Sequence, residues 1–122
     1  MTPLLVIVGA MIGAPTRYLT DRLVQSRHDS LFPWGTFTVN IVGSFILGFL
    51  AAASSRHGLP APVVAFAGTG FCGALTTYST FSYETVRLME NGSRFYALAN
   101  VVASIVAGLG SALCGAAIAT AL

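Results

Sequence analysis

Residues 73–84, GALTTYSTFSYE, place five small hydroxyl-bearing side chains among aromatic rings and end in a carboxylate. Tyr78 and Phe81 are three residues apart, so on a helix their rings share one face, with Thr77 and Thr80 beside them. Hydroxyl groups can donate hydrogen bonds, and the edge of an aromatic ring carries the positive end of its quadrupole. Such groups suit the binding of a small anion that accepts hydrogen bonds strongly.

Glu84 is the only charged residue in this segment, which argues against other kinds of site. A path for cations ordinarily shows rings of acidic residues, and a path for bulky anions shows arginine or lysine. Ser79 and Thr80 have no histidine or lysine nearby to activate them as nucleophiles, so we do not expect an enzyme. Packing of an aromatic, serine-rich helix explains the same residues, and an ion pair with Arg87 explains Glu84 as well as a pore role does.

The chain that carries this segment is too apolar for a water-soluble fold. Of its 122 residues, 55% are hydrophobic and 8% are charged, whereas soluble domains are about 25% charged. The charged residues leave three uncharged stretches, at 30–55, 57–83 and 95–122. Each is long enough for a helix that crosses the roughly 30 Å hydrocarbon core of a bilayer.

The first stretch of the chain, residues 1–16, becomes a fourth span if the helix continues through Arg17 to about Leu23. A cleaved signal peptide is the competing interpretation, but no basic residues precede the apolar run. We therefore expect an all-α membrane protein with four transmembrane helices that form a single domain over residues 1–122. The net charge of +2 is too small to predict nucleic-acid binding.

The third span is expected to be broken near its middle. Gly68, Gly70 and Gly73 weaken a helix, and the β-branched Thr76 and Thr77 follow them. Irregular backbone is tolerated at membrane depth only where its polar groups line a cavity, meet other protein groups or bind ions. A break between Gly73 and Thr77 therefore predicts a site at this place.

Two other spans carry polar side chains that need partners in a membrane. Asn40 lies inside the second span, where an unpaired amide is costly, so either a packing hydrogen bond or a ligand is expected. Tyr96, Asn100 and Ser104 recur every fourth residue on one face of the last span. Interhelical hydrogen bonds explain this face, and so does a polar track for a solute.

Three blocks of sequence resemble one known family. GAPTRY at 13–18, PWGTFTVNIVGSFILGF at 33–49 and GFCGALTTYSTFSYE at 70–84 are similar to the Fluc (CrcB-type) fluoride channels, bacterial and archaeal proteins that export fluoride. The resemblance covers all four expected spans in order. It implies a channel of the inner membrane that passively exports fluoride to relieve its toxicity.

The resemblance also implies an assembly and a set of site residues. It implies an antiparallel dimer with two fluoride pores and a structural sodium ion at its centre, held by backbone carbonyls of Gly73 and Thr76. The implied pore residues are the amide Asn40, the ring pair Tyr78 and Phe81, the polar lining Thr77, Ser79, Thr80 and Ser82, and the fourth-helix track Tyr96, Asn100 and Ser104. The family usually has phenylalanine where this chain has Tyr78, and the added phenol could donate to fluoride or close the pathway.

The arginines are distributed unevenly between the two ends of the spans. Four, Arg22, Arg27, Arg87 and Arg94, fall on one side, and only Arg56 falls on the side of the termini. This count favours a fixed orientation with the termini outside. A homodimer of opposite orientations would be better served by a balanced count, so a heterodimer with an oppositely oriented paralogue is the alternative assembly.

Two other functions are compatible with the sequence. A small multidrug-type exporter that exchanges protons for a cation also has four spans, but it needs a membrane-embedded carboxylate, and the first span has none before Asp21. A non-conducting membrane subunit that only packs against partners is the other possibility. Proton-dependent cation flux would favour the first, and absence of any flux the second.

Overall fold

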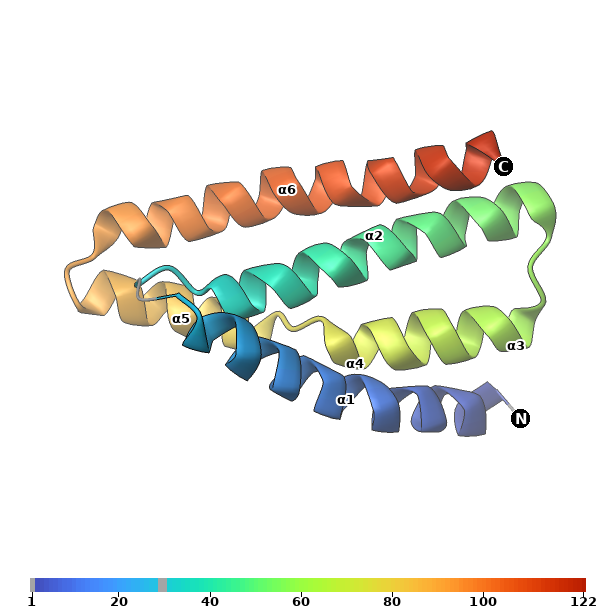
Figure 1. Cartoon of the computed structure of the whole chain (residues 1–122), viewed down its shortest axis with the longest axis horizontal. Helices are drawn as coiled ribbons and strands as arrows, with labels where there is room; N and C mark the ends of the chain where they lie inside the picture. Colours follow the sequence, from blue (N-terminus) through green and yellow to red (C-terminus); the bar gives the residue numbers. More distant parts are fainter. Residues whose placement is uncertain (1, 29–30) are drawn as a thin grey trace.

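The computed structural model describes residues 2–28 and 31–122, and every regular element in them is helical. Three of the helices, α1 (Thr2–Ser26), α2 (Trp34–His57) and α6 (Arg94–Ala121), are long and apolar enough to cross a membrane. A further pass consists of α3 (Ala61–Val63), η1 (Val64–Cys72), α4 (Gly73–Leu75) and α5 (Ser79–Glu90). The four passes run in alternating directions, with both termini at one end of the molecule (Figure 1). The predicted four-helix, all-α membrane fold is confirmed.

Glycines allow the helices to approach closely. A Cβ atom at Gly9 would collide with the carbonyl of Phe66, and one at Gly70 would lie 2.6 Å from the carbonyl of Val6, so α1 and η1 are in backbone contact. A Cβ at Gly115 would likewise collide with the carbonyl of Phe45 between α6 and α2. In a membrane, helices gain no hydrophobic free energy by associating, so van der Waals packing stabilises their contacts. Small residues favour such packing because they let the helix backbones approach closely.

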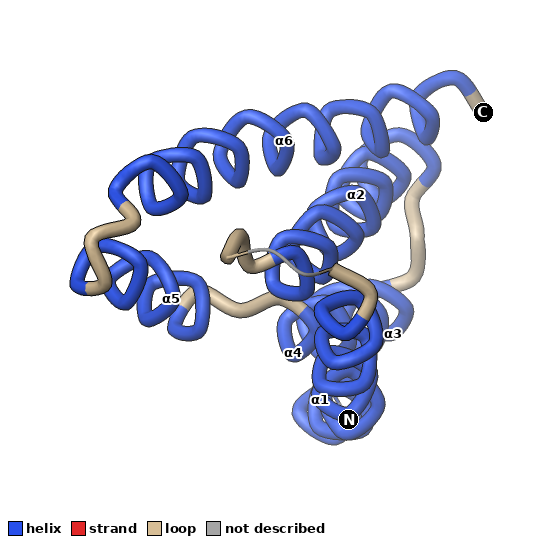
Figure 2. The backbone as a smooth tube through the Cα atoms, turned by 60° about the vertical axis from the view of Figure 1, so that its left-hand side comes forward, coloured by secondary structure: helices blue, strands red, loops and turns tan. Residues whose placement is uncertain are grey.

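The third pass is interrupted at the predicted place. Helix α4 ends at Leu75, Thr76 has extended backbone angles (φ −79°, ψ 156°), and α5 begins at Ser79. The hydroxyl of Thr77 accepts a hydrogen bond from the Thr80 amide (3.2 Å), which satisfies one of the free amides at the start of α5. The break separates α5 from the rest of the pass, as the backbone trace shows (Figure 2).

The segment before the break was not predicted in detail. Residues Val64–Cys72 form a π-helix, whose wider turns are rare and usually short. Gly70 of this segment therefore has a second consequence besides weakening an α-helix. It lets the widened backbone lie directly against Val6 and Gly9 of α1.

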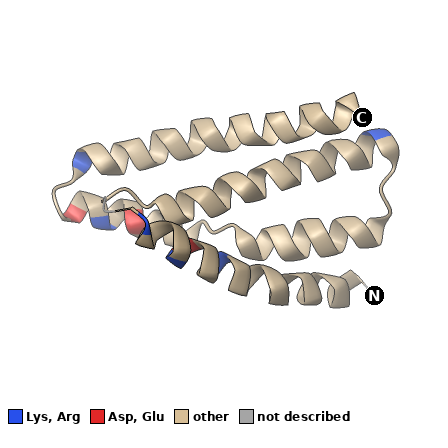
Figure 3. Ribbon diagram, viewed as in Figure 1, with Lys and Arg blue, Asp and Glu red and all other residues tan. Residues whose placement is uncertain are grey.

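Most of the charged residues that the structure describes lie toward one end of the molecule, where α1 ends and α5 and α6 meet (Figure 3). Arg87 lies in the last turn of α5 and Arg94 begins α6, whereas Arg56 lies in the last turn of α2 at the opposite end. The fold thus keeps the uneven distribution of arginines that the sequence predicted.

Candidate functional site

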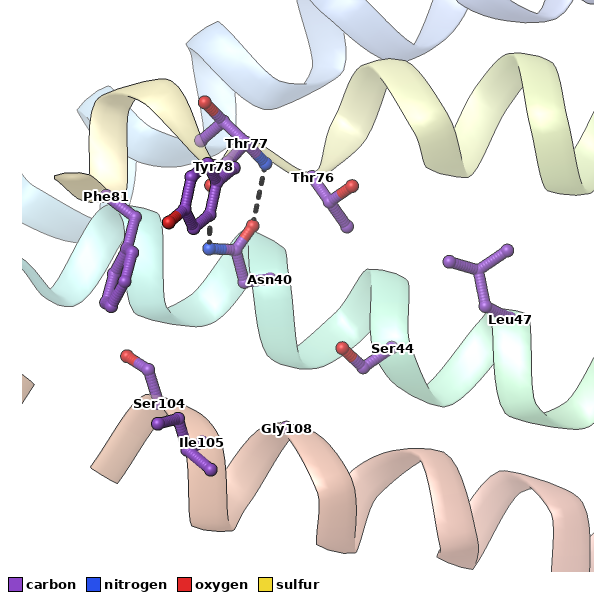
Figure 4. A pocket seen from close by; sticks show the side chains of 10 residues that line it. All are labelled: Asn40, Ser44, Leu47, Thr76, Thr77, Tyr78, Phe81, Ser104, Ile105 and Gly108. Atoms are coloured by element: carbon purple, nitrogen blue, oxygen red, sulfur yellow. Dashed lines mark hydrogen bonds between the residues drawn. The ribbon is translucent and has the colours of Figure 1, made fainter. Parts of the chain in front are cut away.

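A cavity of about 380 Å³ lies at the helix break, between α2, α5 and α6. Figure 4 shows the side chains around it. Its lining consists of Asn40, Ser44, Leu47, Thr76, Thr77, Tyr78, Phe81, Ser104, Ile105 and Gly108. These described residues contribute an amide, hydroxyls, aromatic rings and aliphatic groups to the lining, and none of them carries a formal charge.

Asn40 binds the broken backbone directly. Its Nδ2 donates to the carbonyl of Thr77 (3.1 Å), and its Oδ1 accepts from the amide of Thr77 (2.8 Å). Figure 4 shows both bonds between α2 and the break. Because Nδ2 carries two hydrogens, one remains to be donated elsewhere. Asn40 therefore satisfies the exposed backbone at the break and still has a donor beside the cavity.

The same pair of bonds changes the hydrogen bonding of the preceding turn. In a continuous helix the Thr77 amide would donate to the carbonyl of Gly73. Here it donates to Asn40 instead, which releases the Gly73 carbonyl from that bond. Thr76 packs its methyl group against Gly43 of α2, and its hydroxyl donates to the carbonyl of Cys72 (3.0 Å).

The two rings of the predicted pair lie next to each other at the cavity. The centroids of Tyr78 and Phe81 are 6.2 Å apart and the planes are inclined by 39°. Phe81 is partly buried, whereas 81% of Tyr78 is exposed. Gly73 is exposed as well, and a Cβ added to it would meet no atom within 4 Å. Tyr78 and Gly73 are therefore both uncovered in the single chain.

The face predicted on the last helix divides into parts with different surroundings. Ser104 lines the cavity, but Asn100 is completely buried and lies outside the lining. Asn100 Nδ2 donates to the hydroxyl of Thr85 (2.8 Å) on α5. Tyr96 packs edge-on against Phe95, with ring centroids 5.7 Å apart.

The structure brings some of the expected site residues to one cavity and leaves others outside it. Asn40, Thr76, Thr77, Tyr78, Phe81 and Ser104 line the cavity, whereas Gly73, Ser79, Thr80, Ser82, Tyr96 and Asn100 do not. Ser44 and Gly108 line it and were missed by the sequence analysis. Ser44 follows Asn40 by four residues, so the helical period pointed to it.

Glu84 is placed away from this cavity. Its carboxylate lies beside Thr36, a residue of α2 that is 2% exposed, and its Oε1 is buried without a hydrogen-bond partner among the described residues. With Gln25 and Arg87 it lines a second cavity of about 280 Å³ at the charged end of the molecule. Glu84 thus lies where α5 meets α2 and does not line the cavity at the break.

Four helical passes and an uncharged polar cavity at the break in one of them define a small multi-pass membrane protein of the channel or transporter class. Its cavity belongs to the membrane-spanning part of the chain, where Asn40 and Phe81 come from different passes. Comparison of its sequence with known proteins identifies the group within this class. The chain belongs to the CrcB-like protein family, Camphor Resistance (CrcB), which it matches over residues 4–116.

Close relatives match almost the whole chain. The fluoride-specific ion channel FluC 1 of Streptomyces avermitilis is 59% identical, over 94% of this chain and 93% of its own length. FluC 1 of Frankia casuarinae is 58% identical, over 100% of this chain and 98% of its own length. The fluoride-specific ion channel FluC 2 of Rhodococcus jostii is 49% identical, over 94% and 96%.

Proposed function

We propose that this protein is a passive channel for fluoride. The observation that carries the proposal is the lining of the cavity at the break, which offers hydrogen-bond donors and ring edges but, among its described residues, no formal charge. Relatives of 59% and 58% identity over nearly the full chain are named fluoride-specific ion channels. The proposal gives this chain the same activity.

Fluoride is small and accepts hydrogen bonds strongly, so neutral donors can replace part of its hydration shell. The free amide hydrogen of Asn40 and the hydroxyl of Ser44 are suitable donors. The ring edges of Tyr78 and Phe81 add weak positive potential. A site without fixed positive charge binds the anion loosely enough for it to leave, which conduction requires.

The driving force needs no coupled reaction. A membrane potential that is negative inside drives an anion outward by about 2.3 kcal/mol for each elementary charge per 100 mV. A proton-coupled cation exporter would need a carboxylate at its solute site. Glu84 lies outside the cavity at the break, which disfavours this alternative.

We also propose that a second, oppositely oriented chain covers the open side of the break. The exposed ring of Tyr78 and the free space at Gly73 support this assembly, because the rest of the chain leaves both residues uncovered. Ser79, Thr80, Ser82 and Tyr96, which lie outside the cavity of the single chain, are proposed to line the pathway beyond it.

A structural sodium ion fits this arrangement. The carbonyls of Gly73 and Thr76 would hold it, and release of the Gly73 carbonyl from the Thr77 amide is the observation that supports the fit. The ion would offset the negative ends of carbonyl dipoles that meet at the interface between the two chains.

We propose that the partner is a second copy of this chain or an oppositely oriented paralogue, and the arginines favour the paralogue. Four arginines at one end and one at the other favour a single orientation for this chain. Relatives that carry the numbers 1 and 2 agree with a pair of paralogues. A reporter fused to the C-terminus tests this point, since equal signals from the two sides of the membrane would contradict a fixed orientation.

The function is tested by efflux from liposomes that contain only the purified protein, with fluoride and chloride compared in parallel. Rapid loss of fluoride with retention of chloride is the expected result for a homodimer. If a folded preparation is silent, the assay is repeated with the paralogue present. Absence of fluoride flux from both preparations would reject the proposed channel, and cation flux that depends on a proton gradient would support the exporter.

A further inference from the structure

Helix α5 carries Phe81 to the cavity, but the break at 76–78 disconnects it from the rest of its pass. A helix of 12 residues that is cut off in this way must be positioned by its side contacts. On one side it lies against α2, where Glu84 is beside Thr36. On the other side it lies against α6, where the contacts with Asn100 are found.

Three linked hydrogen bonds run through the contact with α6, and the middle one joins the two helices. Ser104 Oγ donates to Asn100 Oδ1 (3.4 Å), Asn100 Nδ2 donates to Thr85 Oγ1 (2.8 Å), and Thr85 Oγ1 donates to the Phe81 carbonyl (2.8 Å). The first and last residues that these bonds link, Ser104 and Phe81, line the cavity. The two middle residues, Asn100 and Thr85, are outside it.

Asn100 is too deeply buried in the single chain to contact a solute in the cavity. Its exposed fraction is 0%, and its amide nitrogen and oxygen both take part in hydrogen bonds within the protein. The hydroxyl of Thr85 accepts one bond and donates another, so its rotamer is determined by partners on two helices. Moving α5 along α6 would break the bond to Asn100 and shift the backbone of Phe81.

We propose that Asn100 and Thr85 are positioning residues that fix Phe81 in the fluoride pathway by locking α5 against α6. This inference rests on the proposed channel function. Asn100 was expected from the sequence to belong to the fluoride track, and the inference gives it a different task. It acts on the solute only through the placement of Phe81.

The test compares Thr85→Val with Thr85→Ser in the liposome efflux assay. Valine keeps the shape of the side chain but removes both bonds of the hydroxyl, whereas serine keeps both. Since small misplacements of a site residue can reduce rates up to about a hundredfold, we expect Thr85→Val to lower fluoride flux at least about tenfold. Thr85→Ser should restore most of the flux, a rescue that a general packing role of the methyl group would not produce.

A double variant shows whether the two residues act through one contact. Asn100→Leu is expected to lower flux as Thr85→Val does, and the double variant should be no worse than either single change, because coupled residues are not additive. If Thr85→Val does not fold, the double variant is compared with the wild type instead, because replacing both polar partners removes the unpaired amide. Flux in the double variant equal to that of the wild type would then overturn the inference.

The outcomes for the wild type and the variants keep the two proposals distinct. Absence of fluoride flux from the wild type, alone and with the paralogue, rejects the channel itself. Wild-type flux together with unchanged flux in a folded Thr85→Val variant rejects only the positioning role. Flux losses that multiply in the double variant would also reject it, because they would show two independent effects.

Discussion

Asn40 bonds to the backbone at the break and offers a hydrogen-bond donor to the cavity, and its replacement by leucine allows the two roles to be measured separately. The change keeps the approximate size of the side chain but removes the bonds of 3.1 and 2.8 Å to the backbone of Thr77, together with the remaining amide donor at the cavity. Hydrogen bonds between membrane helices are worth on average about 0.6 kcal/mol and at most about 1.7. The two lost bonds should therefore lower the stability of the fold by about 1–3 kcal/mol.

The expected effect on transport is larger than this destabilisation explains. A protein that is stable by about 5–15 kcal/mol stays largely folded after such a loss. A hydrogen bond to a charged group contributes about 1.5–3 kcal/mol. If Asn40 donates to fluoride at the barrier, flux should fall roughly ten- to a hundredfold, because about 1.4 kcal/mol corresponds to a factor of ten in rate.

Two measurements on the same preparation test this reasoning. Thermal unfolding in detergent reports the lost bonds to Thr77, and fluoride efflux from liposomes reports the lost donor. Asn91→Leu is the matched control, since Asn91 is an exposed residue at the end of α5, away from the cavity at the break. A lower unfolding temperature with flux near that of the wild type would refute the donor role and leave Asn40 as a structural clamp only.

Three further substitutions address the rings and the glycines. Tyr78→Phe should keep fluoride flux within about twofold of the wild type in the efflux assay because the ring and its edges are retained; a larger loss would show that the phenol itself takes part. Gly73→Ala should leave the chain folded, because a Cβ there meets no atom within 4 Å, yet it should weaken dimerisation and flux, as chemical crosslinking and efflux would show. An unchanged dimer with full flux would contradict a partner at this place. Gly70→Ala should destabilise the fold by about 1–3 kcal/mol through overpacking against Val6, measured by thermal unfolding beside Gly110→Ala, whose Cβ meets open space; equal stability of the two variants would refute the close packing of α1 and η1.

Much of the fold follows from the positions of the charged residues. The gaps between charges determine where a helix can cross the membrane, which is a local property of the sequence. The break was also predictable, because the run from Gly68 to Gly73 and the β-branched Thr76 and Thr77 weaken the helix in place. The π-helical turns of η1 were not predicted from the sequence, and neither was the close contact of Gly70 with α1, which lies far away in the sequence.

The partner of Asn40 shows a similar limit. Burial of an amide in a membrane predicts that some partner exists, and this expectation needs only the sequence. That the partner is the backbone of Thr77 depends on how α2 lies along the break, since both bonds join residues 37 positions apart. The polarity of the Asn40 amide thus predicted that it has a partner, and only the packing of the helices determined which residue that partner is.

The polar face of α6 illustrates how one sequence pattern can serve two purposes. A spacing of four places Asn100 and Ser104 on the same face, and it predicts nothing about what covers each of them. Because α5 runs back along α6 from its end at Glu90, Thr85 reaches Asn100, and Phe81 comes to the level of Ser104 near the break. Asn100 is therefore covered by α5, whereas Ser104 lines the cavity at the break, where α5 begins. The position of the break along the third pass thus determines that Asn100 bonds to α5 and that Ser104 lines the cavity.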